Sequence, residues 1–108
     1  MPDKYDDNRR LTKEIHKQEK LEKERIETAK QIVRNLEDQK RIEREHLDLV
    51  DKHQNYWYAE IKKTKETDRE RYEGLKEKLE REKEIRNKIL DHIKHLDKEI
   101  KIQKEHIP

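Results

Sequence analysis

Apolar residues recur along this chain at the spacing that is typical of a long amphipathic helix. From Tyr72 to Ile107 they fall at alternating steps of three and four residues, with polar residues at three of these positions. The same heptad spacing runs from Ile26 to Ile61. Apolar residues at heptad positions a and d form the line along which helices supercoil. The pattern therefore predicts an all-α fold in which a long, nearly continuous helix, residues 11–107, forms a coiled coil.

Two steps of eleven residues interrupt the heptads, over residues 15–26 and 61–72. Insertions of four residues into a heptad pattern locally unwind a supercoil. Residues 1–10 precede the pattern, and we expect them to form an N-terminal cap or a frayed segment.

The apolar residues at positions a and d, here called the seam, are expected to carry the association of two or more helices. A solitary charged helix would scatter its apolar residues, whereas these are confined to one line. The seam comprises Ile26, Val33, Leu36, Leu47, Val50, Trp57, Ile61, Leu75, Leu79, Ile89, Ile93, Leu96 and Ile100.

The composition supports a helical rod rather than a globular domain. Only 28% of the 108 residues are hydrophobic and 52% are charged, which is too little apolar material for an ordinary core. The 29 basic and 27 acidic residues nearly cancel and are evenly spread, so the clustered positive face of a nucleic-acid-binding protein is not expected. No apolar run approaches the length of a membrane span. We expect a cytoplasmic protein, with association with the cytoskeleton as one alternative.

The sequence gives no indication of catalysis. It has no cysteine and a single glycine, so it offers neither a thiol nucleophile nor a glycine-rich phosphate loop. A single long helix also has no means of enclosing a dry pocket. We therefore expect neither an enzyme nor a small-molecule substrate, cofactor or metal.

Charged residues within the seam line indicate how the helices are oriented. In a parallel, in-register dimer Lys40, Glu43, Glu82 and Arg86 would each face the same residue of the other helix, which costs free energy. An antiparallel arrangement instead places Lys40 near Glu82 and Glu43 near Arg86. Buried polar residues are known to fix register and orientation. The pattern thus favours an antiparallel dimer, with a four-helix assembly as an alternative.

The same antiparallel pairing is compatible with an intramolecular helical hairpin that turns near residue 63. Thr67 and Glu70 have the spacing of a capping box, which could restart a helix there. Residues 61–66, however, contain no Gly, Pro or Asn to build a turn. We therefore predict a continuous helix that pairs between chains.

Histidines lie beside the seam at several positions. His46, His53 and His92 all take the g position, and His95 follows His92 by three residues. A pair at this spacing supplies only two metal ligands, so we interpret these side chains as solvated. One hypothesis is that their protonation near pH 6 tunes the pairing of the helices.

Between residues 42 and 61 the apolar face is wider than two helices need. The additional residues are Ile42, Leu49, Tyr56 and Tyr58, which flank the seam residue Trp57. Aromatic residues are enriched in the energetically important parts of interfaces. This strip predicts either a wider self-associating core or a third surface that contacts another helix or a partner protein.

The function that this pattern favours is structural. We expect a self-associating coiled-coil rod, most simply a homodimer, that acts as an oligomerisation, scaffold or spacer element. The alternative is a helical docking module that binds a cytoskeletal filament, another coiled-coil protein or a large assembly through the strip between residues 42 and 61.

Overall fold

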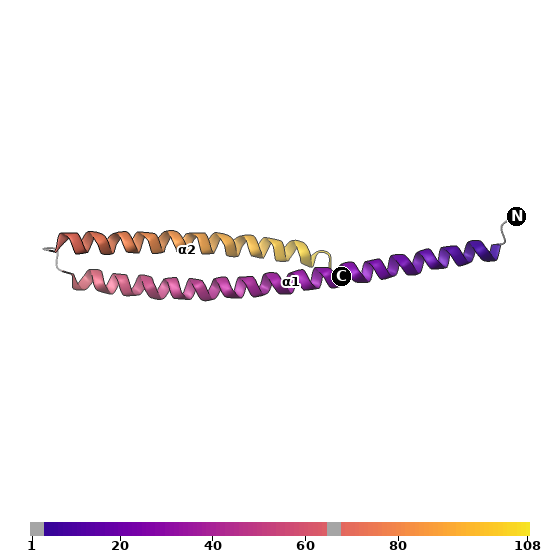
Figure 1. Ribbon diagram of the computed structural model, residues 1–108, viewed down its shortest axis with the longest axis horizontal. Coiled ribbons are helices and arrows are strands. Elements are labelled where there is room, and N and C mark those ends of the chain that lie inside the picture. Colours follow the sequence, from indigo (N-terminus) through magenta and orange to yellow (C-terminus); the bar gives the residue numbers. More distant parts are fainter. Residues whose placement is uncertain (1–3, 65–67) are drawn as a thin grey trace.

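The computed structural model describes residues 4–64 and 68–108. In these residues the chain forms two helices, α1 (Lys4–Lys63) and α2 (Arg69–Lys104). The helices lie side by side in opposite directions and form a hairpin (Figure 1). The molecule measures 100 × 17 × 15 Å, so the fold is all-helical and very elongated.

The two helices differ in length, and this difference leaves part of α1 without a neighbour. α1 has 60 residues and α2 has 36. The N-terminal part of α1 therefore extends past the end of α2, and the C-terminus of the chain lies beside α1 part of the way along it (Figure 1). The side chains from Asp7 to Arg25 are all exposed.

Local hydrogen bonds cap the C-terminal end of α1 and the N-terminal end of α2. Thr64 donates its hydroxyl to the carbonyl oxygen of Glu60 at 2.8 Å, and its backbone N–H reaches the same oxygen at 3.0 Å. At the start of α2, the carboxylate of Asp68 accepts from the backbone N–H of Arg71 at 3.4 Å. A side-chain acceptor at this position satisfies one of the free N–H groups of a helix N-terminus.

The expectation of one continuous helix is wrong, because the helix ends at Lys63 and a new one begins at Arg69. The interruption lies inside the eleven-residue step between residues 61 and 72. Thr64 and Asp68 are polar there, so no apolar contact favours a helix that continues through this segment.

Folding back lets the second half of the seam cover the first half within one chain. Closing a short loop costs less entropy than bringing two chains together, so the hairpin forms readily once the helix is interrupted. The turn needs no Gly, Pro or Asn in residues 61–66. Thr67 of the expected capping box lies outside the described residues, and the cap that the structure shows is Asp68.

A single line of small and medium-sized apolar side chains forms the core between the helices. Leu96 is the most buried of them, with 2% of its surface exposed. Both helices contribute to this line, with about one side chain per turn from each. The buried residues are Ala29, Val33, Val50, Leu75, Leu79, Leu96 and Ile100.

Within the part of the chain that the structure describes, neither helix has a stretch long and apolar enough to cross a membrane.

Candidate interaction surfaces

The seam residues lie between α1 and α2 of the same chain. Each of them is buried or half-buried in the hairpin. The periodicity of the sequence thus identifies the residues that meet, but here they meet within one chain. Their expected role in association between chains stays a prediction.

Cross-helix ion pairs show the register in which the two helices meet. Lys40 of α1 pairs with Asp97 of α2. Nearer the turn, the guanidinium Nε of Arg86 donates to Oδ1 of Asp51 at 2.9 Å. Arg71 and Glu60 approach to 3.6 Å close to the turn. In each pair, a residue of one helix meets a residue of opposite charge on the other helix. The α1 numbers rise while the α2 numbers fall, so the helices are antiparallel.

Within the single chain, the hairpin does not bring together the pairs Lys40–Glu82 and Glu43–Arg86 that were predicted between chains. Because α1 ends at Lys63 and α2 begins only at Arg69, each α1 residue faces a later position of α2 than in a pairing centred at residue 63. Lys40 therefore meets Asp97, and Arg86 meets Asp51. All four residues expected to set the register are half-buried, and their role in setting the register between chains stays a prediction.

Glu43 and Glu82 contact histidines instead of basic residues. Oε2 of Glu43 lies 3.3 Å from Nδ1 of His92 across the interface, and Oε1 lies 3.6 Å from Nδ1 of His46 on α1. Glu82 lies 3.6 Å from Nδ1 of His53. Each contact is an ion pair only when the imidazole is protonated. The hypothesis that histidine protonation tunes the pairing stays a prediction.

Three residues that the sequence did not single out complete this interface. Asp51 and Asp97 lie at flanking heptad positions, and only the register of the hairpin brings them to Arg86 and Lys40. The third is Gln54, whose amide nitrogen is buried and has no hydrogen-bond partner in the described part of the chain. Its heptad position, seven residues from the seam residues on either side, is the signal that could have identified it.

Trp57 packs into the interface, and its neighbours surround it from both helices. Its ring meets that of Tyr56 edge to face, with 5.0 Å between the centroids. From α2, the ammonium of Lys78 lies 4.7 Å from the centroid of the Trp57 ring. Such cation–π contacts are worth about 0.5–1 kcal/mol at exposed sites.

The apolar strip predicted between residues 42 and 61 is divided between two sides of α1. Ile42, Leu49 and Tyr56 are spaced by seven residues, so they form one line on the helix surface. They are 44%, 51% and 57% exposed. Tyr58 is also exposed, but it lies two residues from Tyr56 and therefore points to nearly the opposite side.

On the side of Tyr58, a local pair changes the titration of a lysine. Lys83 donates to Oε1 of Glu80 at 3.3 Å. This hydrogen bond, together with the negative charge of Glu80, raises the pKa of Lys83 above its ordinary value. Lys83 thus remains a cation throughout the physiological range.

The second exposed apolar surface is the part of α1 that α2 does not reach. We call residues 7–21 the arm. Leu11, Ile15 and Leu21 of the arm are 65%, 48% and 48% exposed. Leu11 and Ile15 continue the line of the seam, whereas Leu21 lies beside it.

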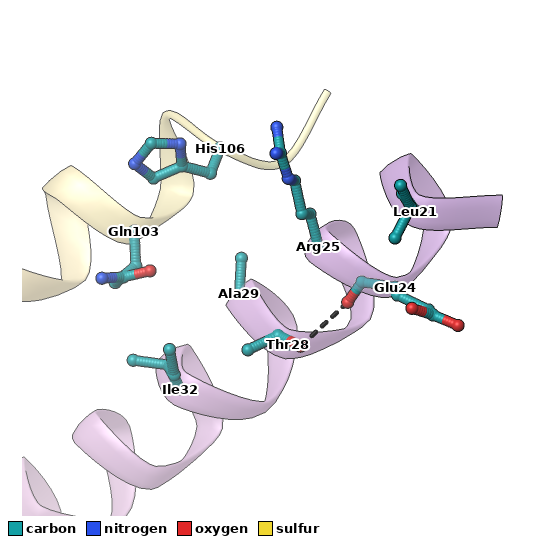
Figure 2. A pocket seen from close by; sticks show the side chains of 8 residues that line it. All are labelled: Leu21, Glu24, Arg25, Thr28, Ala29, Ile32, Gln103 and His106. Atoms are coloured by element: carbon teal, nitrogen blue, oxygen red, sulfur yellow. Dashed lines mark hydrogen bonds between the residues drawn. The ribbon is translucent and has the colours of Figure 1, made fainter. Parts of the chain in front are cut away.

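A shallow groove marks the junction between the arm and the hairpin. In Figure 2, Gln103 of α2 and His106 of the segment that follows α2 lie across from Ala29 and Ile32 of α1, and Leu21 lies further along α1. From this groove toward the turn, α2 covers the seam face of α1, so the uncovered part of the seam line lies on the arm.

In the two described ranges, no group of three or more His, Cys, Asp or Glu side chains is arranged to hold a metal ion. Comparisons with protein-family models, curated proteins and solved structures find no match to this chain.

Proposed function

We propose that this protein is a structural rod: an antiparallel coiled-coil hairpin that self-associates and acts as a spacer or scaffold. The observation that carries the proposal is the elongated shape of the molecule together with the single line of seam residues. A molecule 100 Å long and at most 17 Å wide places its seam residues along one line. Such a body holds its two ends at a fixed separation.

Physical chemistry supports the two parts of this proposal. Regular a and d packing makes a helical pair stiffer than a single helix, because each buried side chain is held by residues of the facing helix. Self-association is supported by the exposed apolar residues, since apolar surface released from water stabilises contacts at about 25 cal/mol per Å². Leu11 on the arm and Leu49 on the hairpin are both more than half exposed.

The test is a concentration series that measures mass and shape together. Sedimentation equilibrium should show a molar mass that rises above 13.5 kDa as the protein concentration increases. X-ray scattering at the lowest concentration should give a radius of gyration near 27.2 Å, which is the value of the single hairpin. A protein that remains a monomer at every concentration, or whose scattering is that of a compact sphere, contradicts the proposal.

A second candidate function is supported by the exposed line of Ile42, Leu49 and Tyr56. An apolar line on a helical pair is a surface onto which another helix or a filament could pack. In this alternative, the hairpin is a docking module for a cytoskeletal filament. Co-sedimentation with purified actin filaments and with microtubules tests it directly. Replacing all three residues by Lys should abolish filament binding and leave the oligomeric state unchanged. Filament binding that the variant retains would show that this surface is not the docking site.

A further inference from the structure

The arm of α1 presents a free segment of the same apolar line that α2 covers elsewhere. We propose that its occupant is the arm of a second copy of this chain, packed in the antiparallel direction. This inference rests on the proposed self-association and names the surface that performs it. Two hairpins would then join end to end, with their turns at the far ends of the assembly.

Continuity with the hairpin interface is the first argument. Along α1, the seam is covered by α2 and then by residues 105–108, which lie against Glu22, Arg25 and Ile26. Beyond Glu22 the same line continues through Ile15 and Leu11 without a neighbour. A helix that enters here antiparallel to α1 runs in the direction of α2, so it extends the existing interface.

The sequence of the arm matches itself in this direction, which is the second argument. Leu11 and Ile15 lie at equal distances on either side of Lys13, and so do Asn8 and Gln18. An antiparallel copy centred at Lys13 places Leu11 against Ile15 of the other chain. It also places Asn8 against Gln18, whose amides can bond to each other. Apolar layers therefore meet apolar layers, and polar layers meet polar layers.

The charges beside this line identify the weakest point of the pairing. Glu14 lies beside this line, one residue from the symmetry axis at Lys13. The two copies of Glu14 therefore approach each other on the same side of the interface. Arg10 and Lys17 lie one turn to either side on the same helix and offset the repulsion in part. The pairing is thus weak in the native chain. Removing this charge should strengthen it, whereas it would not alter association through any other surface.

The end-to-end arrangement has a distinct shape. An overlap of roughly eighteen residues corresponds to about 27 Å at a rise of 1.5 Å per residue. Two hairpins of 100 Å joined in this way form a rod about 170 Å long. Two hairpins packed side by side would remain close to the length of one.

The experiment measures the dimerisation constant by sedimentation equilibrium and the maximum dimension by X-ray scattering, on the full chain. The double variant Leu11→Lys and Ile15→Lys should weaken dimerisation about tenfold or more, because it places charges in both apolar layers. Glu14→Gln should strengthen it. Ile85→Lys is the matched control, since Ile85 is 44% exposed but lies on α2 of the hairpin, and it should leave dimerisation unchanged.

Circular dichroism of each variant shows that the hairpin itself is intact. Weaker association of the double variant, together with a native dimer about 170 Å long, supports the inference. Dimerisation that the double variant leaves unchanged overturns the inference but retains the proposed self-association. A native dimer close to the length of one hairpin also overturns the inference and retains the proposed self-association. A chain that stays monomeric at all concentrations overturns both.

Discussion

Gln54 places a primary amide inside the narrow core between α1 and α2. Its amide nitrogen is buried and has no hydrogen-bond partner within the described residues. A buried donor without a partner loses its hydration and gains nothing in return, which costs about 1–3 kcal/mol. The seam thus carries a local defect beside Val50 and Trp57.

Replacing Gln54 by Leu should remove this cost and raise the free energy of unfolding by about 1–3 kcal/mol. Urea unfolding followed by circular dichroism measures the change. Gln39→Leu is the control, because Gln39 is exposed on the same helix and should change stability by less than about 0.5 kcal/mol. A Gln54 variant no more stable than the native chain would show that the amide is satisfied in solution.

Gly74 lies within α2 where a side chain would be tolerated. A Cβ added there meets no atom within 4 Å, and no described glycine has a positive φ. Gly74→Ala should therefore stabilise the helix by about 0.5–1 kcal/mol, because alanine loses less backbone entropy on folding. Thermal unfolding gives the sign. A lower melting temperature would mean that this part of α2 is not helical in solution.

At the scale of the helices, the sequence indicated which faces meet, and it offered a hairpin turning near residue 63 only as an alternative to the continuous helix. Apolar spacing identifies a helix face directly, since 3.6 residues make one turn. Whether the chain turns depends instead on which has the lower free energy, folding back within one chain or pairing with another chain. That difference includes the entropy of the whole chain. Residues 61–66 contain no Gly, Pro or Asn, and for this reason the sequence favoured the continuous helix over the hairpin. The register followed from the turn, so the partners of Lys40 and Arg86 could not be predicted.

The register is tested by a double-mutant cycle on Arg86. Arg86→Ala and Asp51→Ala, alone and together, should show a coupling energy of about 0.2–1 kcal/mol, because both side chains are partly exposed. The matched cycle of Arg86 with Glu43, the partner expected from the sequence, should show no coupling. Urea unfolding provides all the values. Coupling to Glu43 in place of Asp51 would contradict the register of the hairpin.

At the scale of the molecule, the exposed arm and the hairpin differ in where their apolar residues lie. The hairpin buries its apolar residues between α1 and α2. The arm keeps Leu11 and Ile15 exposed and is the segment through which we propose that rods join. The sequence predicted an elongated, self-associating helical protein, and the antiparallel orientation was found within one chain. The arm could not be anticipated, because it arises from the unequal lengths of α1 and α2.

The central claim is that α1 and α2 of one chain fold back on each other. The most direct test is a distance measurement by pulsed electron paramagnetic resonance. The chain has no native cysteine, so spin labels can be placed at Arg44→Cys and Lys94→Cys, both exposed positions on facing parts of the helices. Diluting labelled chains in excess unlabelled protein restricts the signal to distances within one chain.

Packed helix axes lie 8–10 Å apart, so the hairpin predicts a distance within about 20 Å between the two labels. A continuous helix would separate the same two positions by about 75 Å. A short distance in the diluted sample supports the hairpin. A distance near 75 Å would contradict it and restore the continuous rod.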